Sequence, residues 1–226
     1  MPTPGPAIRY PKKMSGPSPW SVVQAVDYER WMGGDGLDQL GPLSALCQEA
    51  VLAAQPDSLL LAGCATGNGL EHVDPSVTRR IVGVDLNLQY LGIARQRFFH
   101  LGPRLELYNA DVQTFRAPPG SFGLIHAGLL LEWLHPEVLV RRVSEWLAAH
   151  GTCSVVLELP GGGGPPPPSP ALVAVVRSMR RVAPEELIGL CASYGLALRR
   201  QKEVPLRYGR RFWHGTFGRS AAEGAG

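Results

Sequence analysis

The sequence predicts an α/β fold in which helices cover both faces of a mostly parallel sheet. Short apolar runs alternate along the chain with helical patterns, which is typical of such a sheet. The first apolar run, residues 59–62, has no polar break, as expected of a strand buried on both faces. A glycine-rich loop follows at once, as in a strand-to-helix turn at the carboxyl edge of a parallel sheet. The 226 residues suffice for one such domain with a large core.

The loop after this strand reads GCATGNG and begins at Gly63. Because glycine lacks a Cβ atom, a ligand could approach the main chain there, although a tight turn without a ligand would need the same residues. The second strand, residues 81–84, leads into Asp85, which lies 18 residues after Gly67. An acidic side chain in that position is placed to accept hydrogen bonds from ribose hydroxyls. The alternative role for Asp85 is a helix cap, but Asn87 can cap the next helix instead.

Apolar spacing, turn residues and prolines predict the remaining elements. Before the first strand we expect helices at 20–32 and 37–55, with a turn at 33–36. The later elements are a short helix at 70–73, a helix at 88–100, strands at 105–110 and 121–127, a helix from Pro136 closed by His150 and Gly151, a strand at 152–159, helices at 171–181 and 184–195, and strands at 196–204 and 211–219.

Composition and cysteine spacing argue against several protein classes. The net charge of +3 is mildly basic and does not by itself imply nucleic acid. The chain has no 18-residue apolar run, so no membrane span is predicted, and its Pro-rich start is unlike a secretory signal. A cytoplasmic location is the default expectation. The four cysteines are far apart, without a CxxC pair, so no metal site is predicted, and Cys47, Cys153 and Cys191 are expected to be reduced core residues.

Composition also divides the chain into segments. Residues 1–19 form a Pro-rich arm and 220–226 a tail, and both are expected to be disordered. Residues 20–57 contain helices that either pack on the core or act as a lid over a cleft. The α/β domain spans 58–219. It includes the tract 160–170, which contains only Pro, Gly and Ser and is expected to be a mobile connection.

Several motifs in this order resemble those of the class I S-adenosylmethionine-dependent methyltransferases. AGCATG resembles the family's first motif, VDLN its second and NADVQTF its third. FGLIHAGLLLEWL resembles the fourth strand and its loop, AAHGTCSVVLEL the fifth strand, and PEELIGLCASYGL the helix before the final strands. The resemblance covers roughly residues 50–219. It implies a doubly wound, Rossmann-like seven-stranded sheet with an antiparallel last strand, and S-adenosylmethionine as cofactor, with S-adenosylhomocysteine as the product.

The resemblance also implies which residues bind the cofactor. Asp85 would hold the ribose hydroxyls, with Leu86 beside the adenine, and Asp111 would accept from the adenine amino group. The full implied set is Gly63, Cys64, Ala65, Gly67, Asp85, Leu86, Asp111, Val112, Ala127 and Gly128. The chain departs from the family at Leu61, where many members carry an acidic residue, and this removes one possible contact to the cofactor's ammonium group.

Methyl transfer needs a general base only if the acceptor atom carries a proton. The candidates expected near the cleft are Glu132, His126 and Tyr28, with Glu158 as a further one. Each of these side chains also has a structural alternative. Glu132 could be solvated or form a salt bridge, His126 could be a hydrogen-bonded core residue, and Tyr28 could simply pack in the first helix. Glu158 ends a buried strand, so it needs a partner or must face the cleft, since an unpaired buried charge is costly.

Three functions are compatible with the sequence. A methyltransferase that acts on a small molecule is favoured, as a monomer or homodimer. An RNA or protein methyltransferase is the second, because seven basic residues against Glu203 give the last strands a net charge of 7 − 1 = +6. The seven basic residues are Arg199, Arg200, Lys202, Arg207, Arg210, Arg211 and Arg219. The third is a non-catalytic module that binds S-adenosylmethionine, suggested by Leu61.

Overall fold

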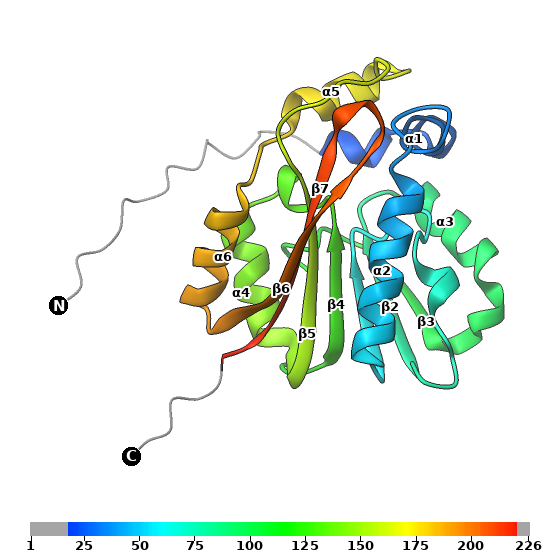
Figure 1. The fold of residues 1–226 in the computed structure, drawn as a ribbon. Coiled ribbons are helices and arrows are strands. Elements are labelled where there is room, and N and C mark those ends of the chain that lie inside the picture. Colours follow the sequence, from blue (N-terminus) through cyan, green and yellow to red (C-terminus); the bar gives the residue numbers. More distant parts are fainter. Residues whose placement is uncertain (1–17, 221–226) are drawn as a thin grey trace.

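The computed structural model describes residues 18–220, which form a single seven-stranded sheet with helices on both faces (Figure 1). The strand order is β3-β2-β1-β4-β5-β7-β6. Strands β1 to β5 are parallel, and β7 is antiparallel to both of its neighbours. The strands are β1 Ser58–Ala62, β2 Arg80–Asp85, β3 Leu105–Asn109, β4 Phe122–Gly128, β5 Leu147–Glu158, β6 Leu196–Pro205 and β7 Arg211–Arg219. The predicted fold, including the antiparallel last strand, is confirmed.

Alternate residues of the central strands point to opposite faces of the sheet. Leu59 and Leu61 pack in one cluster with residues of α2 and α3, whereas Leu60 packs in another with residues of α4 and α6. Burial on both faces explains why β1 is apolar throughout. The helices are α1 Ala25–Met32, α2 Leu40–Ala54, α3 Leu88–Arg97, α4 Pro136–Trp146, α5 Pro170–Ser178 and α6 Pro184–Ser193, with shorter 3₁₀ turns η1 Pro19–Val22, η2 Leu70–His72, η3 Phe99–Arg104, η4 Leu131–Trp133 and η5 Arg207–Gly209.

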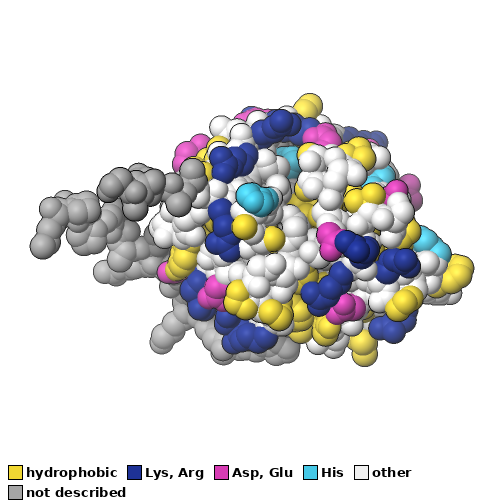
Figure 2. Space-filling view, turned by 90° about the horizontal axis from the view of Figure 1, so that it is seen from below, with side chains coloured by type: hydrophobic (Ala, Val, Ile, Leu, Met, Phe, Trp, Pro, Cys, Tyr) yellow, Lys and Arg dark blue, Asp and Glu magenta, His cyan; other side chains and the backbone are white. Residues whose placement is uncertain are grey.

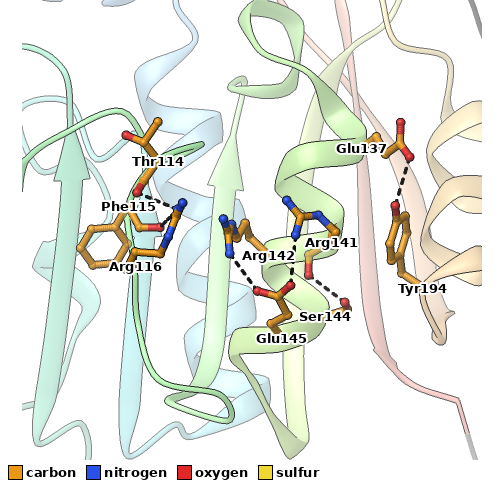
Figure 3. Close-up of polar contacts among 9 residues, drawn as sticks. All are labelled: Thr114, Phe115, Arg116, Glu137, Arg141, Arg142, Ser144, Glu145 and Tyr194. Atoms are coloured by element: carbon orange, nitrogen blue, oxygen red, sulfur yellow. Dashed lines mark hydrogen bonds and ion pairs between the residues drawn. The ribbon is translucent and has the colours of Figure 1, made fainter.

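Polar contacts reinforce the face covered by α4 and α6, as Figure 3 shows. The hydroxyl of Tyr194, just past α6, donates to Glu137 in the first turn of α4 at 3.1 Å. Within α4, Arg141 and Arg142 both reach Glu145, at 3.4 and 3.1 Å. These pairs are exposed or half-buried and contribute little each, so the packing of this face depends mainly on its buried apolar residues.

The N-terminal segment and α5 lie across the carboxyl ends of the parallel strands (Figure 1). Asn87 fixes the N-terminal segment there. Its Oδ1 accepts from the backbone N–H groups of Gln89 and Tyr90 and so caps α3, as predicted. Its Nδ2 donates to the carbonyls of Trp20 and Val23, at 3.0 and 2.8 Å.

The structure differs from the sequence predictions at several element boundaries. For example, α2 begins at Leu40 rather than at residue 37, and α5 ends at Ser178 rather than at residue 181. The helix expected at 20–32 is broken at residues 23 and 24 into η1 and α1. The helix expected at 88–100 ends at Arg97, and a 3₁₀ segment continues the chain. The prediction that His150 and Gly151 close α4 is wrong, because α4 ends at Trp146 and both residues lie within β5. A strand that begins with Leu147 and pairs it with Phe122 explains the difference.

The Pro/Gly tract at 160–170 lies against the β6–β7 hairpin. The N–H of Gly163 donates to the carbonyl of Tyr208 at 3.0 Å, and Arg210 Nη1 donates to the carbonyl of Gly163 at 3.2 Å. The tract's mobility stays a prediction. The arm at 1–19 and the tail at 220–226 lie outside the described residues, except for residues 18, 19 and 220. None of the helices within 18–220 has the length and apolar character needed to cross a membrane.

Candidate functional site

A cavity of about 490 Å³ lies at the carboxyl edge of the sheet. Its walls come from the loops after β1, β2, β3 and β4, from α1 and from the Pro/Gly tract. Seven of the ten residues expected to bind the cofactor line it: Gly63, Ala65, Asp85, Leu86, Asp111, Val112 and Gly128. Ligand sites in open α/β sheets form at this edge, outside the carboxyl ends of the strands.

Asp85 lies at the end of β2, where the backbone holds its carboxylate in place. One oxygen accepts from the N–H of Ala65 at 2.9 Å and the other from the N–H of Asn87 at 2.8 Å. Burial raises the pKa of Asp85, while the backbone donors act against that rise. A carboxylate has about four acceptor positions, so some capacity remains for a ligand.

Asp111 lies one strand away on the same edge. Its Oδ1 accepts from the N–H of Gln113 at 2.8 Å, and the side-chain nitrogen of Gln113 lies 3.3 and 3.2 Å from the two carboxylate oxygens. Gln113 also lines the cavity and accepts from the N–H of His135 at 3.1 Å. The two acidic residues therefore share one cavity, as the sequence predicts.

The glycine loop contributes less to the cavity than its sequence suggests. Gly63 lines the cavity with φ +68°, a conformation that favours glycine. Gly67 has φ +94°, and a Cβ there would lie 2.6 Å from the Phe98 ring, so packing explains this glycine. Cys64 and Ala127 are buried in the core, and neither they nor Gly67 are among the residues that line the cavity.

Of the three predicted catalytic side chains, the structure brings only Tyr28 to the cavity. Tyr28 lies on α1 beside Tyr90, with ring centroids 5.1 Å apart. Burial, together with the charge of Asp85, raises the pKa of Tyr28 far above its ordinary value. The phenol is therefore neutral at neutral pH and able to hydrogen bond, but poorly suited to remove a proton.

Glu132 and His126 are buried and are not among the residues that line the cavity. Glu132 is 1% exposed, and its Oε1 accepts from the N–H of Glu158 at 2.9 Å. Burial raises the pKa of Glu132 to about 7. His126 Nδ1 lies 3.0 Å from the hydroxyl of Ser154, which is 2.9 Å from His214 Nε2, and burial lowers the pKa of His126 to about 3. A catalytic role for either residue stays a prediction, which this geometry does not favour.

Another part of the cavity wall is aromatic and apolar. Trp20 packs edge-on against Trp133 with centroids 5.1 Å apart, and both line the cavity. Trp31, Met32 and Met179 complete this wall. The sequence does not predict that Trp133 contacts Trp20 or that Met179 lines the same cavity, because no local pattern encodes these contacts.

The residues present fit an adenosyl sulfonium cofactor. Asp85 offers spare acceptors where ribose hydroxyls would lie. Gly63 and Ala65 have little or no side chain, so they leave room for a ligand close to the backbone. Leu86 and Val112 supply apolar surface to the same cavity as Asp111. Half-buried carboxylates next to apolar surface suit a nucleoside with a diol and a flat base.

Comparison with known proteins agrees with this arrangement. Residues 59–151 match the family model described as a methyltransferase domain. A search of curated proteins finds no match.

Solved structures share the fold. The 1,6-didemethyltoxoflavin-N1-methyltransferase of Burkholderia thailandensis is 17% identical, with a TM-score of 0.63 and 94% of each chain covered. The N-methyltransferase NodS of Bradyrhizobium japonicum, in complex with S-adenosylhomocysteine, is 15% identical, with a TM-score of 0.66 and coverage of 91% of this chain and 100% of NodS. The [4+2]-cyclase SpnF is 17% identical, with a TM-score of 0.64 and coverage of 80% and 81%.

Such low identities establish a common fold rather than a common substrate. The domain match and the strand order agree with each other. Residues 59–151 contain a methyltransferase domain, and the sheet has the strand order of the class I S-adenosylmethionine-dependent methyltransferase fold.

Proposed function

We propose that this protein transfers a methyl group from S-adenosylmethionine to an O, N or C atom of a small molecule held in the cavity. The observation that carries this proposal is that Asp85, Asp111 and the aromatic side chains line one and the same cavity. Cofactor and acceptor would then meet in that cavity.

The size of the cavity supports a small acceptor. Its volume of about 490 Å³ lies in the lower half of the 300–1,000 Å³ typical of small-molecule sites. The cofactor itself is of drug size, so little room remains beside it. The Pro/Gly tract and the N-terminal helices cover the space from two sides, and we propose that these two segments act as the lid.

Methyl transfer from a sulfonium requires the protein mainly to position the two reactants, and it does not require a strong acid or base. A bound S-adenosylmethionine supplies an activated methyl group on its sulfonium. Asp85 would anchor the ribose end, and the backbone at Gly128 would lie beside the reacting centre. The aromatic wall would hold the acceptor in line with the methyl group and keep water away. Tyr28 would orient a ligand by a hydrogen bond.

The contacts of the basic C-terminal strands favour the small-molecule acceptor over RNA. Six of the seven basic side chains bond within the chain: Arg199 to the Arg219 carbonyl, Lys202 to Glu49, Arg207 to the Gly34 carbonyl, Arg210 to Glu158, Arg211 to Glu203, and Arg219 to the Ser144 and Leu147 carbonyls. Figure 2 shows the edge away from the cavity, where basic side chains are scattered and several have acidic neighbours. There Arg79 pairs with Asp57 at 2.6 Å.

Calorimetry with S-adenosylhomocysteine tests the first step, and a panel of small acceptors with labelled S-adenosylmethionine tests the second. Binding together with label transfer to a small molecule is the expected result. Absence of binding would refute the cofactor assignment. Binding without transfer to any acceptor would favour the non-catalytic module. RNA binding with a steep salt dependence would favour a nucleic-acid substrate instead.

A further inference from the structure

A buried polar cluster lines the same cavity as the aromatic side chains. Glu158, the last residue of β5, is 8% exposed and lines the cavity. Its carboxylate forms an ion pair with Arg210, which precedes β7, and it accepts from the side chain of Gln39 at 3.4 Å. Gln39, next to α2, is 1% exposed, and both it and Arg210 line the cavity too. Three distant parts of the chain thus bring hydrogen-bonding groups to one spot.

This cluster has bonding capacity left over. Arg210 has five N–H donors, of which one serves Glu158 and one the carbonyl of Gly163. Arg210 Nε is buried without a hydrogen bond in the described part of the chain. Glu158 accepts two bonds where about four are possible. Glu158 and Arg210 therefore both line the cavity and both have hydrogen-bonding capacity that these contacts do not use.

The charges of the cluster limit what it can bind. Arg210 already neutralises the charge of Glu158. An anionic ligand group would therefore be repelled by the carboxylate, and a cationic group would be repelled by the guanidinium. A neutral group that both donates and accepts would satisfy both partners without leaving a charge unpaired. Amide, lactam and ureido edges have this pattern. The apolar neighbours Trp31, Trp133 and Met179 suit a flat body behind such an edge.

We propose that Glu158 and Arg210 determine acceptor specificity, and that the acceptor is a small flat molecule with a neutral donor–acceptor edge of the lactam or amide type. This inference rests on the proposed function, because it assigns a class of acceptor to the same cavity. Gln39 positions the carboxylate of Glu158.

A purely structural role for the ion pair would be to hold the hairpin against the rest of the protein. The chain has other contacts for that purpose: the Gly163 N–H to the Tyr208 carbonyl, and Arg207 to the carbonyl of Gly34 at 3.1 Å. A surface ion pair on the same hairpin, Arg211 with Glu203 at 2.7 Å, provides a matched comparison outside the cavity.

The test measures binding of three flat bicyclic probes by ligand-observed NMR, with and without saturating S-adenosylhomocysteine. Quinolin-2-one presents a lactam edge, quinoline only an acceptor, and 2-naphthoate an anion. We expect the wild-type protein to bind quinolin-2-one at least tenfold more tightly than either of the others. Glu158→Gln should abolish this preference and Glu203→Gln should preserve it.

Equal binding of the three probes by the wild type, a preference for 2-naphthoate, or an unchanged preference in Glu158→Gln would each overturn the proposal. Thermal unfolding checks that the variants are folded, and Arg210→Lys replaces Glu158→Gln if the latter does not fold. Failure of S-adenosylhomocysteine to bind the wild type would refute the proposed function instead. The binding of the three probes measured without S-adenosylhomocysteine would still show whether Glu158 and Arg210 prefer a lactam edge.

Discussion

The side-chain nitrogen of Asn87 lies 2.8 Å from the carbonyl oxygen of Val23, so one buried amide joins the N-terminal segment to the end of β2. The oxygen of the same amide caps α3, and the N–H of the same residue donates to Asp85. The segment that covers the cavity and the carboxylate at its floor are therefore tied to one residue.

Substitutions at Asn87 should separate these roles. Asn87→Asp keeps an oxygen that caps α3 but loses the donor to Trp20 and Val23, whose carbonyls would then face a carboxylate. We expect a loss of about 1–3 kcal/mol in the free energy of unfolding, with faster amide hydrogen exchange in α1. Asn87→Ala should also loosen the first turn of α3. Unchanged exchange in α1 of Asn87→Asp would contradict the tether.

Loss of the carboxylate at Asp85 should weaken cofactor binding. Asp85→Ala removes a charged acceptor, which is worth about 1–3 kcal/mol, or about 5- to 150-fold in the dissociation constant of S-adenosylhomocysteine. Asp57→Ala removes an exposed carboxylate just before β1 and serves as the control, with binding expected to stay at the wild-type level. A folded Asp85→Ala protein that binds as tightly as the wild type would refute the role of Asp85.

The sheet could be predicted from the sequence because its signals are local. Runs such as 59–62 and 81–84 are apolar without interruption only because both faces are covered, and parallel strands bring their carboxyl ends to one edge. Asp85 and Asp111 at the ends of β2 and β3 then have to be neighbours, as the structure shows. Local patterns do not predict the contacts of side chains whose partners are distant in sequence.

The parts of the site that could not be predicted depend on such distant partners. The sequence does not reveal that Gly67 makes room for Phe98 rather than for a ligand, since both reasons demand glycine. Nor does it reveal that the Glu132 side chain accepts a hydrogen bond from the backbone of Glu158, because a single short 3₁₀ turn such as η4 does not show from its sequence which way its side chains point. The meeting of Gln39, Glu158 and Arg210 likewise follows only from the assembled fold.

Glu132 should make the stability of the protein fall as the pH rises. Burial raises its pKa from 4.5 to about 7, so between these values the folded state binds more protons than the unfolded state. The free energy of unfolding then decreases with rising pH, by at most about 1.4 kcal/mol per pH unit. Glu132→Gln should remove this slope. Urea unfolding between pH 5 and 8 measures it, and an unchanged slope in the variant would show that Glu132 is not its source.

His126 should act in the opposite direction at lower pH. Burial, with a smaller effect of His214, lowers the pKa of His126 from 6.5 to about 3, so the unfolded state binds more protons in this window. Stability therefore falls as the pH decreases from 6.5 toward 3. Between about pH 4.5 and 6.5 this slope opposes that of Glu132. His126→Gln should flatten the acid limb of the unfolding curve, whereas His150→Gln, at an exposed position, should leave it unchanged.

Two adjacent glycines of the Pro/Gly tract, Gly162 and Gly163, allow a test variant and its control to be compared. Gly162 has φ +72°, and a Cβ there would lie 2.6 Å from the backbone nitrogen of Arg210, whereas a Cβ at Gly163 would have no atom within 4 Å. Gly162→Ala should therefore lift the tract from the hairpin, because alanine is disfavoured at this φ and the backbone of Arg210 cannot yield easily. Gly163→Ala should leave the tract in place.

The hydrogen bond from the N–H of residue 163 to the carbonyl of Tyr208 reports on this contact. Its amide should exchange with solvent at least tenfold faster in Gly162→Ala than in Gly163→Ala or the wild type. If the tract covers the cavity, its release should also speed the dissociation of S-adenosylhomocysteine. Faster exchange without faster dissociation would mean that the tract rests on the hairpin but does not retain the ligand, and that the lid consists of the N-terminal helices alone.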